Sequence, residues 1–308
     1  NCARGGMVDE AALAERLKSG RIAGAASFAK ALEIGGRLPW SPVATDHEDI
    51  AFLQYTGGTT GVPKGAMLTH GNIVANLQQA HAWIRSGLDE RGETVVTALP
   101  LYHIFALLAN CLTFMKIGAS NLLITNPRDI PALVKELARH RITNMFTVPT
   151  ILKMMVEHPA VDANDHSSLR YIIYAGAPMY RADQKLALQK LGKVLVQYFG
   201  LGEVTGCITV LPPDMHAIDD NDPHAHIGSC GKPRVGMEIA ILDQDMQPVP
   251  VGTIGEICCR GPAVFSGYHN QPEATEKALR GGWFHTGDLA VMEADRYVKI
   301  KDRSKDII

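Results

Sequence analysis

Apolar stretches of strand length alternate with stretches of helical spacing between residues 93 and 198. Runs rich in Val, Ile and Thr predict strands, whereas apolar residues spaced three or four apart predict helices. The predicted strands are 93–100, 120–125, 144–148, 169–174 and 194–198, and the predicted helices are an apolar one ending at Met115, 130–140, 150–157 and 181–191. This alternation predicts an α/β fold with a mostly parallel sheet and flanking helices.

The pattern changes after Gly228. Short apolar runs separated by Gly, Pro and Asp turns predict strands at 237–242, 256–260, 289–292 and 297–300. Strands without long intervening helices indicate a β-rich subdomain. The chain is therefore divided into an α/β part at 27–227 and a β-rich part at 228–301.

A loop rich in glycine and threonine follows an expected strand at 50–55. Residues 55–65 read Y-T-G-G-T-T-G-V-P-K-G. Backbone N–H groups of such a loop can converge on an anion, and the hydroxyls and Lys64 add donors and a positive charge. The loop is not a Walker loop, because proline precedes the lysine and glycine follows it. It predicts a polyphosphate site, with a plain surface turn as the alternative.

The segments beside this loop are also patterned. Residues 66–68 predict the second strand of a hairpin, and 72–84 predict a helix with Asn72 as its N-cap. A short helix is expected at 27–32, followed by a loop containing two prolines.

Charge and cysteine usage narrow the classes of function. The 308 residues carry a net charge of −2, which argues against a nucleic-acid partner. The six cysteines show no C-x-x-C spacing, so we expect reduced thiols in the cytoplasm rather than a disulfide or zinc framework. The longest apolar run, 104–115, is too short to span a bilayer.

The glycine-rich loop and its continuation G-A-M-L-T-H-G-N-I resemble the phosphate loop of the adenylate-forming enzymes, which include the acyl-CoA synthetases. The resemblance implies that ATP phosphates bind here. The residues it assigns to this task are Thr56, Gly57, Gly58, Thr59, Thr60, Gly61 and Lys64, with Thr59 and Lys64 counted as catalytic.

A second motif, Q-Y-F-G-L-G-E at 197–203, superficially suggests a dinucleotide loop, but its glycine spacing does not fit that fingerprint. It resembles the Y-G-x-T-E motif of the same family. The resemblance implies that Phe199 and Gly200 contact adenine and that Glu203 is catalytic and holds Mg²⁺. Gly202 stands where the family usually has threonine, which puts one contact near the α-phosphate in doubt.

Three further stretches resemble the family. A-G-A-P at 175–178 follows a strand, and the resemblance places Gly176, Ala177 and Pro178 beside adenine. W-F-H-T-G-D and D-R-S-K-D resemble motifs that assign ribose contacts to Asp288 and Arg303. His103, within P-L-Y-H-I-F, is an expected lining residue of the acyl and adenylate pocket; a plain core histidine is the alternative.

Residues 1–26 resemble part of the D-2-hydroxyacid dehydrogenases, phosphoglycerate dehydrogenase in particular. The cofactor-binding and acid/base residues of that family are absent, so Arg4 receives no role. We expect that residues 1–26 are a foreign segment joined near Ser27 to the synthetase-like part of the chain. At the other end, 302–308 resemble the hinge before the family's C-terminal domain, which we expect to be missing together with its lysine.

The resemblance covers residues 27–308. Residues 27 to about 145 resemble bacterial long-chain fatty acyl-CoA synthetases in particular, and the rest resembles acyl-CoA synthetases more generally, so the whole is assigned to the long-chain type. The resemblance implies a truncated large domain of an enzyme that converts a fatty acid and ATP to acyl-AMP and then, with coenzyme A, to acyl-CoA. A nucleotide-binding remnant without turnover and another carboxylate–CoA ligase are the alternatives. The expected location is the cytoplasm, with peripheral contact at the inner membrane face left open; acyl chain length and oligomeric state are not readable.

Overall fold

The computed structural model describes residues 27–56, 63–84 and 92–303. The chain divides into two compact units, residues 1–45 and 46–308. In the first unit, helix α2 (Phe28–Gly35) begins after Ser27, whose hydroxyl accepts a hydrogen bond from the Lys30 N–H at 3.2 Å. A serine here satisfies an N–H that the first turn leaves unpaired, and the short predicted helix is confirmed.

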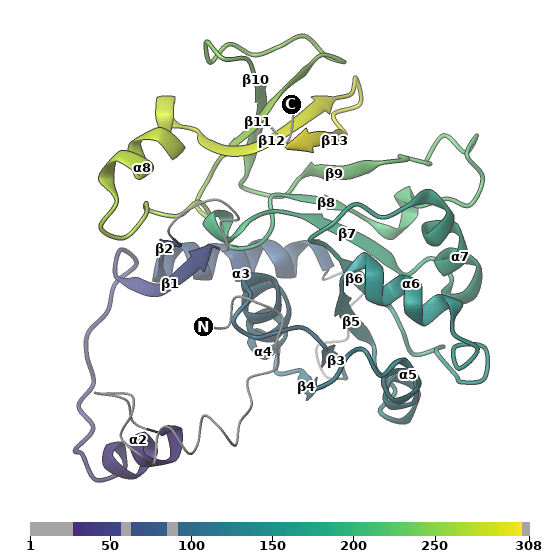
Figure 1. The fold of residues 1–308 in the computed structure, drawn as a ribbon, viewed down its shortest axis with the longest axis horizontal. Coiled ribbons are helices and arrows are strands. Elements are labelled where there is room, and N and C mark those ends of the chain that lie inside the picture. The colour runs from purple at the N-terminus through teal and green to yellow at the C-terminus, as the bar shows by residue number, and fades with distance from the viewer. Residues whose placement is uncertain (1–26, 57–62, 85–91, 304–308) are drawn as a thin grey trace. The chain divides into compact units, whose positions relative to one another are not determined.

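The second unit is built on an 11-stranded sheet in the order β10-β11-β12-β13-β9-β8-β7-β6-β5-β3-β4 (Figure 1). The last five strands in this order pair in parallel, as predicted. They are β7 (Leu195–Phe199), β6 (Tyr171–Tyr174), β5 (Asn144–Thr147), β3 (Thr94–Thr97) and β4 (Ser120–Leu123). The helices that connect them are α5 (Ile130–Arg139), α6 (Pro149–Glu157) and α7 (Arg181–Leu191).

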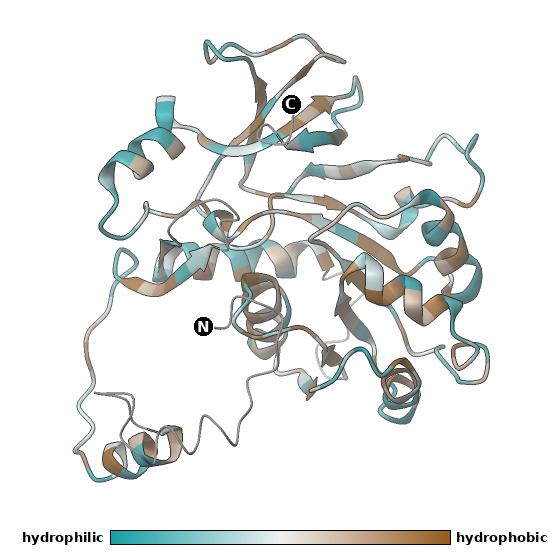
Figure 2. Ribbon diagram, in the orientation of Figure 1, coloured by the Kyte–Doolittle hydropathy of each residue, from teal (hydrophilic) through white to brown (hydrophobic). Residues whose placement is uncertain are grey.

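Both faces of the parallel strands are covered, because successive side chains of a strand point to opposite faces. Val96 and Met145 pack on one face with residues of α5, α6 and α7. Their neighbours Val95 and Phe146 pack on the other face with residues of the apolar helical segment after Ile104. Figure 2 shows the resulting pattern, with hydrophobic central strands and largely hydrophilic connecting loops.

The apolar helix differs from the prediction in type. It consists of a π-helix, η2 (Phe105–Leu112), followed by the short α4 (Thr113–Lys116). The buried Asn110 donates from Nδ2 to the Val96 carbonyl at 3.2 Å, and the Thr113 hydroxyl donates to the Leu108 carbonyl at 2.9 Å. The Asn110 bond therefore ties this helix to β3, whereas the Thr113 bond lies within the helical segment. Among the described residues, no helix is long and apolar enough to cross a membrane.

Strand β3 is shorter than the expected 93–100. It ends at Thr97, and the chain turns at Pro100. Because β3 lies between β4 and β5, a proline could not donate to either neighbour. The proline therefore marks the end of the pairing segment rather than its interior.

The glycine-rich loop lies between β1 (Ile50–Thr56) and β2 (Lys64–Thr69), which form a separate antiparallel pair. The predicted hairpin is confirmed, and helix α3 (His70–Ile84) follows it directly.

The N-cap of α3 is Thr69, so the expected cap at Asn72 is wrong. The Asn72 N–H donates to Thr69 Oγ1 at 3.2 Å, and the Thr69 N–H donates to Asn72 Oδ1 at 3.0 Å. This reciprocal pair is a capping box with asparagine in place of the usual glutamate or glutamine. Asn72 also donates from Nδ2 to the carbonyls of Pro262 and Val264, so it ties the helix start to a distant segment.

The β-rich part is antiparallel and continues the same sheet. Strand β9 pairs with β8 on one side and with β13 on the other. The antiparallel strands of the sheet are β8 (Thr209–Leu211), which precedes this part, and β9 (Ser229–Pro233), β10 (Glu238–Leu242), β11 (Ile254–Arg260), β12 (Phe284–Met292) and β13 (Val298–Arg303). Short helical elements are η3 (Gly202–Val204), η4 (Pro213–Met215), α8 (Pro272–Ala278) and η5 (Arg280–Gly282). The domain boundaries expected after residues 26, 227 and 301 stay predictions.

Candidate functional site

Thr56 and Lys64 are brought together at the end of the β1–β2 hairpin. They face each other in the strand register, and the Thr56 hydroxyl donates to the Lys64 carbonyl at 3.4 Å. Both side chains are half-buried. The other predicted phosphate-binding residues lie outside the described residues: Gly57, Gly58, Thr59, Thr60 and Gly61. The hairpin therefore fixes both ends of the predicted phosphate loop.

Tyr268 connects Lys64 with Glu203. Lys64 Nζ lies 4.9 Å from the centroid of the Tyr268 ring, within the range of a cation–π contact. The Tyr268 hydroxyl donates to Glu203 Oε1 at 2.8 Å. Burial, and then the charge of Glu203, raise the pKa of Tyr268, so the hydroxyl stays protonated and remains a donor. The lysine and the carboxylate predicted from separate motifs thus belong to one cluster.

Glu203 is positioned by the turn that precedes and contains it. It is only 7% exposed, and its backbone carbonyl accepts the Phe265 N–H at 2.7 Å. A Cβ on Gly200 would lie 2.6 Å from the Cys207 backbone, so this position requires glycine for close approach of two chain segments. A Cβ on Gly202 would lie 3.4 Å from Gln54 Cγ, in ordinary contact, which places the η3 turn against β1.

The segment containing His103 lies beside the same hairpin. Gln54 donates from Nε2 to the Tyr102 carbonyl at 3.2 Å, and Gly206 packs against Ile104. His103 Nδ1 accepts the Phe105 N–H at 3.2 Å, and desolvation lowers the pKa of the imidazole. His103 is therefore neutral near pH 7, and its exposed position argues against a core histidine.

The predicted adenine residues come from the carboxyl ends of two neighbouring parallel strands. Phe199 ends β7, and Gly176, Ala177 and Pro178 follow β6. Residues 176–178 are exposed, and Gly176 has a φ of +86°, which favours glycine. The edge where parallel strands end is the usual ligand side of an open α/β sheet.

Asp288 and Arg303 face each other in the pairing of β12 with β13. Asp288 is 6% exposed, and its N–H donates to Thr286 Oγ1 at 3.1 Å. Burial raises the pKa of Cys230 to about 12, and the charge of Asp288 adds to this effect. Strand β13, the partner of β12, pairs in turn with β9, the strand that contains Cys230. The side chain of Arg303 lies outside the described residues.

A chain of contacts connects Cys230 of β9 with the adenine edge. The Cys230 carbonyl accepts the Thr209 hydroxyl at 2.6 Å, and Thr209 pairs with Phe199 across β8 and β7. Residues predicted from four separate motifs thus lie along one continuous part of the sheet and the adjoining hairpin.

The family model described as AMP-binding enzyme matches residues 6–269. The chain belongs to the AMP-binding enzyme family. The matched range includes most of residues 1–26, and the dehydrogenase origin expected for that segment stays a prediction. A protein of Salmonella typhimurium named long-chain-fatty-acid–CoA ligase is 45% identical over 284 residues, which are 92% of this chain and 49% of that protein.

Other relatives of the chain have related names. A feruloyl-CoA synthase of Amycolatopsis is 36% identical over 88% of this chain and 52% of its own length. Among solved structures, O-succinylbenzoate coenzyme A synthetase of Bacillus subtilis in complex with AMP has a TM-score of 0.74 at 28% identity, over 85% of this chain and 51% of its own. ATP-bound MatB of Rhodopseudomonas palustris has a TM-score of 0.74 at 29% identity, over 88% of this chain and 51% of its own. The chain spans about half the length of the curated relatives it matches.

Tyr268 is the site residue that sequence reasoning missed. It lies 65 positions from Glu203, in a segment whose G-Y-H-N letters carry no catalytic signal. Only the fold brings its hydroxyl to the carboxylate, so no spacing rule would have found it.

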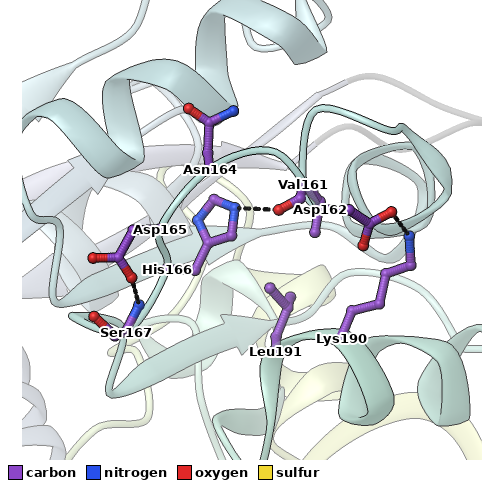
Figure 3. Close-up of a pocket in the computed structure, with 8 residues that line it drawn as sticks. All are labelled: Val161, Asp162, Asn164, Asp165, His166, Ser167, Lys190 and Leu191. Carbon is purple, nitrogen blue, oxygen red and sulfur yellow. Dashed lines mark hydrogen bonds and ion pairs between the residues drawn. The ribbon is translucent and has the colours of Figure 1, made fainter.

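A hollow of about 400 Å³ is lined by residues between Val161 and Ser167, which follow α6, and by Lys190 and Leu191 at the end of α7 (Figure 3). Its polar groups bond with one another: Lys190 pairs with Asp162 at 2.6 Å, and His166 Nε2 donates to the Val161 carbonyl at 3.1 Å. None of the predicted site residues lines it. It receives no role in the nucleotide site.

Proposed function

We propose that the protein containing these residues is a fatty acid–CoA ligase that forms AMP. The observation that carries the proposal is the Lys64–Tyr268–Glu203 cluster, because it sets a cation and a buried carboxylate beside the two fixed ends of the glycine-rich loop. The cation of Lys64 suits a loop that binds anions, and the carboxylate of Glu203 suits the Mg²⁺ ion that accompanies a nucleotide. Membership of the AMP-binding enzyme family supports the same assignment.

The phosphates of ATP are assigned to the hairpin loop. Thr56, Thr59 and Thr60 would donate hydroxyl protons, the backbone of Gly57, Gly58 and Gly61 would donate N–H groups, and Lys64 would supply charge near the β- and γ-phosphates. Glu203 fits a magnesium ligand, since Mg²⁺ takes one or two carboxylates together with substrate phosphates. The Tyr268 hydroxyl fixes the orientation of that carboxylate.

The nucleoside is assigned to the sheet. Phe199 with Gly200 and the 176–178 segment would contact adenine, and Asp288 with Arg303 would contact ribose. A carboxylate that accepts two hydroxyl protons suits a ribose diol. His103, whose segment lies against β1, would line the acyl side of the site.

The reaction has two halves. A carboxylate oxygen attacks the α-phosphorus and pyrophosphate leaves; the thiolate of coenzyme A then attacks the acyl carbon and AMP leaves. The first half depends on charge neutralisation and positioning more than on a protein nucleophile. The residues above supply both, and none of them needs to form a covalent bond.

Pyrophosphate release tests the proposal. The assay uses ATP, Mg²⁺ and, in parallel, hexadecanoate, ferulate and a short dicarboxylate, with this chain and with a longer protein containing it. Release that is fastest with hexadecanoate supports the ligase, and release with another acid alone indicates a different carboxylate–CoA ligase. ATP binding without release from either protein would show a nucleotide-binding remnant and contradict the proposal.

Two finer expectations stay predictions. One is the cytoplasmic location with peripheral contact at a membrane. The other is a foreign origin of residues 1–26, in which Arg4 contributes nothing; deletion of the segment should leave ATP affinity unchanged if that origin is correct.

A further inference from the structure

Three side chains with metal-ligating atoms meet on the two central strands of the β-rich part. Cys258 of β11 faces His285 of β12 in the strand register. Glu256 lies two residues before Cys258, on the same side of β11, and the register shifts between them. Such irregularities re-aim side chains, and here the carboxylate reaches the imidazole. Their ligand atoms lie within 4.8 Å of one another.

The distances suit a tetrahedral ion. Cys258 Sγ and His285 Nδ1 are 3.5 Å apart. A zinc ion with Zn–S of about 2.3 Å and Zn–N of about 2.0 Å in tetrahedral geometry separates these two atoms by about 3.5 Å. Glu256 Oε2 lies 2.8 Å from Nδ1, so the carboxylate must only swing outward by a fraction of an ångström to become a third ligand.

Outer hydrogen bonds orient two of the three side chains. His285 Nε2 faces the Arg280 carbonyl at 3.3 Å, which leaves Nδ1 directed at the other two ligand atoms. Glu256 Oε1 accepts the Gly287 N–H at 2.9 Å, which leaves Oε2 for an ion. Ligating histidines usually donate their second N–H to a carbonyl or carboxylate, and ligating carboxylates are in turn hydrogen-bonded. The cluster already contains both supports.

We propose that Glu256, Cys258 and His285, none of which is assigned to the nucleotide, form a three-ligand site for a divalent ion of the zinc type. The S, N and O donor set suits Zn²⁺ better than Mg²⁺ or Ca²⁺, which prefer oxygen. Water completes the fourth position, since the side chains of Glu256 and His285 are 28% and 11% exposed. Binding releases the thiol proton of Cys258 and the Nδ1 proton of His285 to solvent, and no bond is oxidised or reduced.

A second cluster provides an internal comparison. His226, Glu293 and Asp295 also hold their ligand atoms within 4.8 Å. Here, however, Lys299 Nζ already pairs with Glu293 at 2.7 Å, and the His226 ring is stacked on Tyr297. The set contains no thiolate. We therefore expect it to bind Zn²⁺ more weakly, and it serves as a control.

Cobalt(II) substitution tests the proposal on the whole chain. A Co²⁺ ion bound by a thiolate shows an intense sulfur-to-metal charge-transfer absorption, which a site of nitrogen and oxygen ligands lacks. We expect one equivalent of Co²⁺ to produce this band, and Zn²⁺ to abolish it by displacement. The band should disappear in Cys258→Ala and in His285→Gln. It should persist in the control variants Cys2→Ser, Cys111→Ser and His226→Gln.

A band that survives in Cys258→Ala, or its absence from the unaltered chain, would overturn the proposal and leave a plain Glu256–His285 ion pair. Because Cys258 is buried, its replacement can weaken the fold. Glu256→Gln, which keeps the shape of the side chain, is therefore the second variant: it should weaken Co²⁺ binding at least tenfold while circular dichroism stays unchanged. An unchanged Co²⁺ affinity in Glu256→Gln would also contradict the site.

Discussion

At the scale of single residues, the arrangement around Glu203 depends on one phenol. Tyr268 touches both charged groups of the cluster, and its hydroxyl donates to a carboxylate that is almost completely buried. Burying a carboxylate without hydrogen-bond donors costs free energy, so this hydrogen bond contributes to the stability of the fold as well as to ligand binding.

Tyr268→Phe removes the hydroxyl and keeps the ring beneath Lys64. A lost hydrogen bond to a buried charge costs about 1.5–3 kcal/mol, so we expect a loss of stability of this size in urea unfolding. We also expect the Mg²⁺ dependence of ATP binding to shift to higher Mg²⁺ concentration, since Glu203 loses its fixed orientation. If both the stability and the Mg²⁺ dependence stayed unchanged, Tyr268 would have no role in the site.

Gly202 allows the opposite test, in which a hydroxyl is added rather than removed. A Cβ there would make ordinary contacts with Gln54 and Thr56, so a side chain fits without strain. Gly202→Thr should restore a hydroxyl near the α-phosphate and strengthen both ATP and AMP binding by about 1 kcal/mol, roughly fivefold. Gly202→Ala is the matched control. If the alanine and threonine variants bound equally, the hydroxyl would have no phosphate partner.

At the scale of elements, the hairpin and helix α3 are joined by the Thr69–Asn72 capping box. Thr69→Ala should destabilise the protein by about 1 kcal/mol, because one N–H of the first turn loses its acceptor. Asn72→Ala should cost more, since Asn72 also donates to the carbonyls of Pro262 and Val264. Equal losses in thermal or urea unfolding would show that the bonds to those two carbonyls contribute little.

The period of apolar residues predicted most elements, but not how they end or what they touch. Strands β3 to β7 and their helices were found because buried parallel strands and amphipathic helices leave strong local patterns. The π-helix was not, because the same run of apolar residues fits an α-helix, and the hydrogen bond from Asn110 to Val96 of β3 is visible only in the fold. The cap at Thr69 was missed because the same letters allow either residue to cap, and only the fold shows which N–H groups remain unpaired.

Family motifs located the site better than patterns of charge. Thr56, Lys64, Glu203 and Asp288 were each predicted from a local stretch, and the fold brings the first three around Tyr268 or its neighbours. The zinc-type cluster was invisible in the cysteine spacing, because its ligands come from two strands paired across the sheet.

At the scale of the whole molecule, the sheet joins a parallel part and an antiparallel part at β7, which pairs in parallel with β6 and antiparallel with β8. The central claim is that one nucleotide extends from the β1–β2 hairpin at its phosphate end to β12 and β13 at its ribose end. Membership of the AMP-binding enzyme family supports nucleotide binding, and each end of the proposed course can be tested separately.

Isothermal titration of ATP and AMP into Asp288→Ala and Lys64→Ala tests this claim most directly. Asp288 is assigned to ribose, which both nucleotides share, so its loss should weaken both by about 1.5–3 kcal/mol, roughly ten- to a hundredfold. Lys64 is assigned to the β- and γ-phosphates, so its loss should weaken ATP binding and leave AMP binding nearly unchanged. Equal weakening of ATP and AMP by Lys64→Ala, or unchanged binding of both in Asp288→Ala, would contradict the proposed course of the nucleotide.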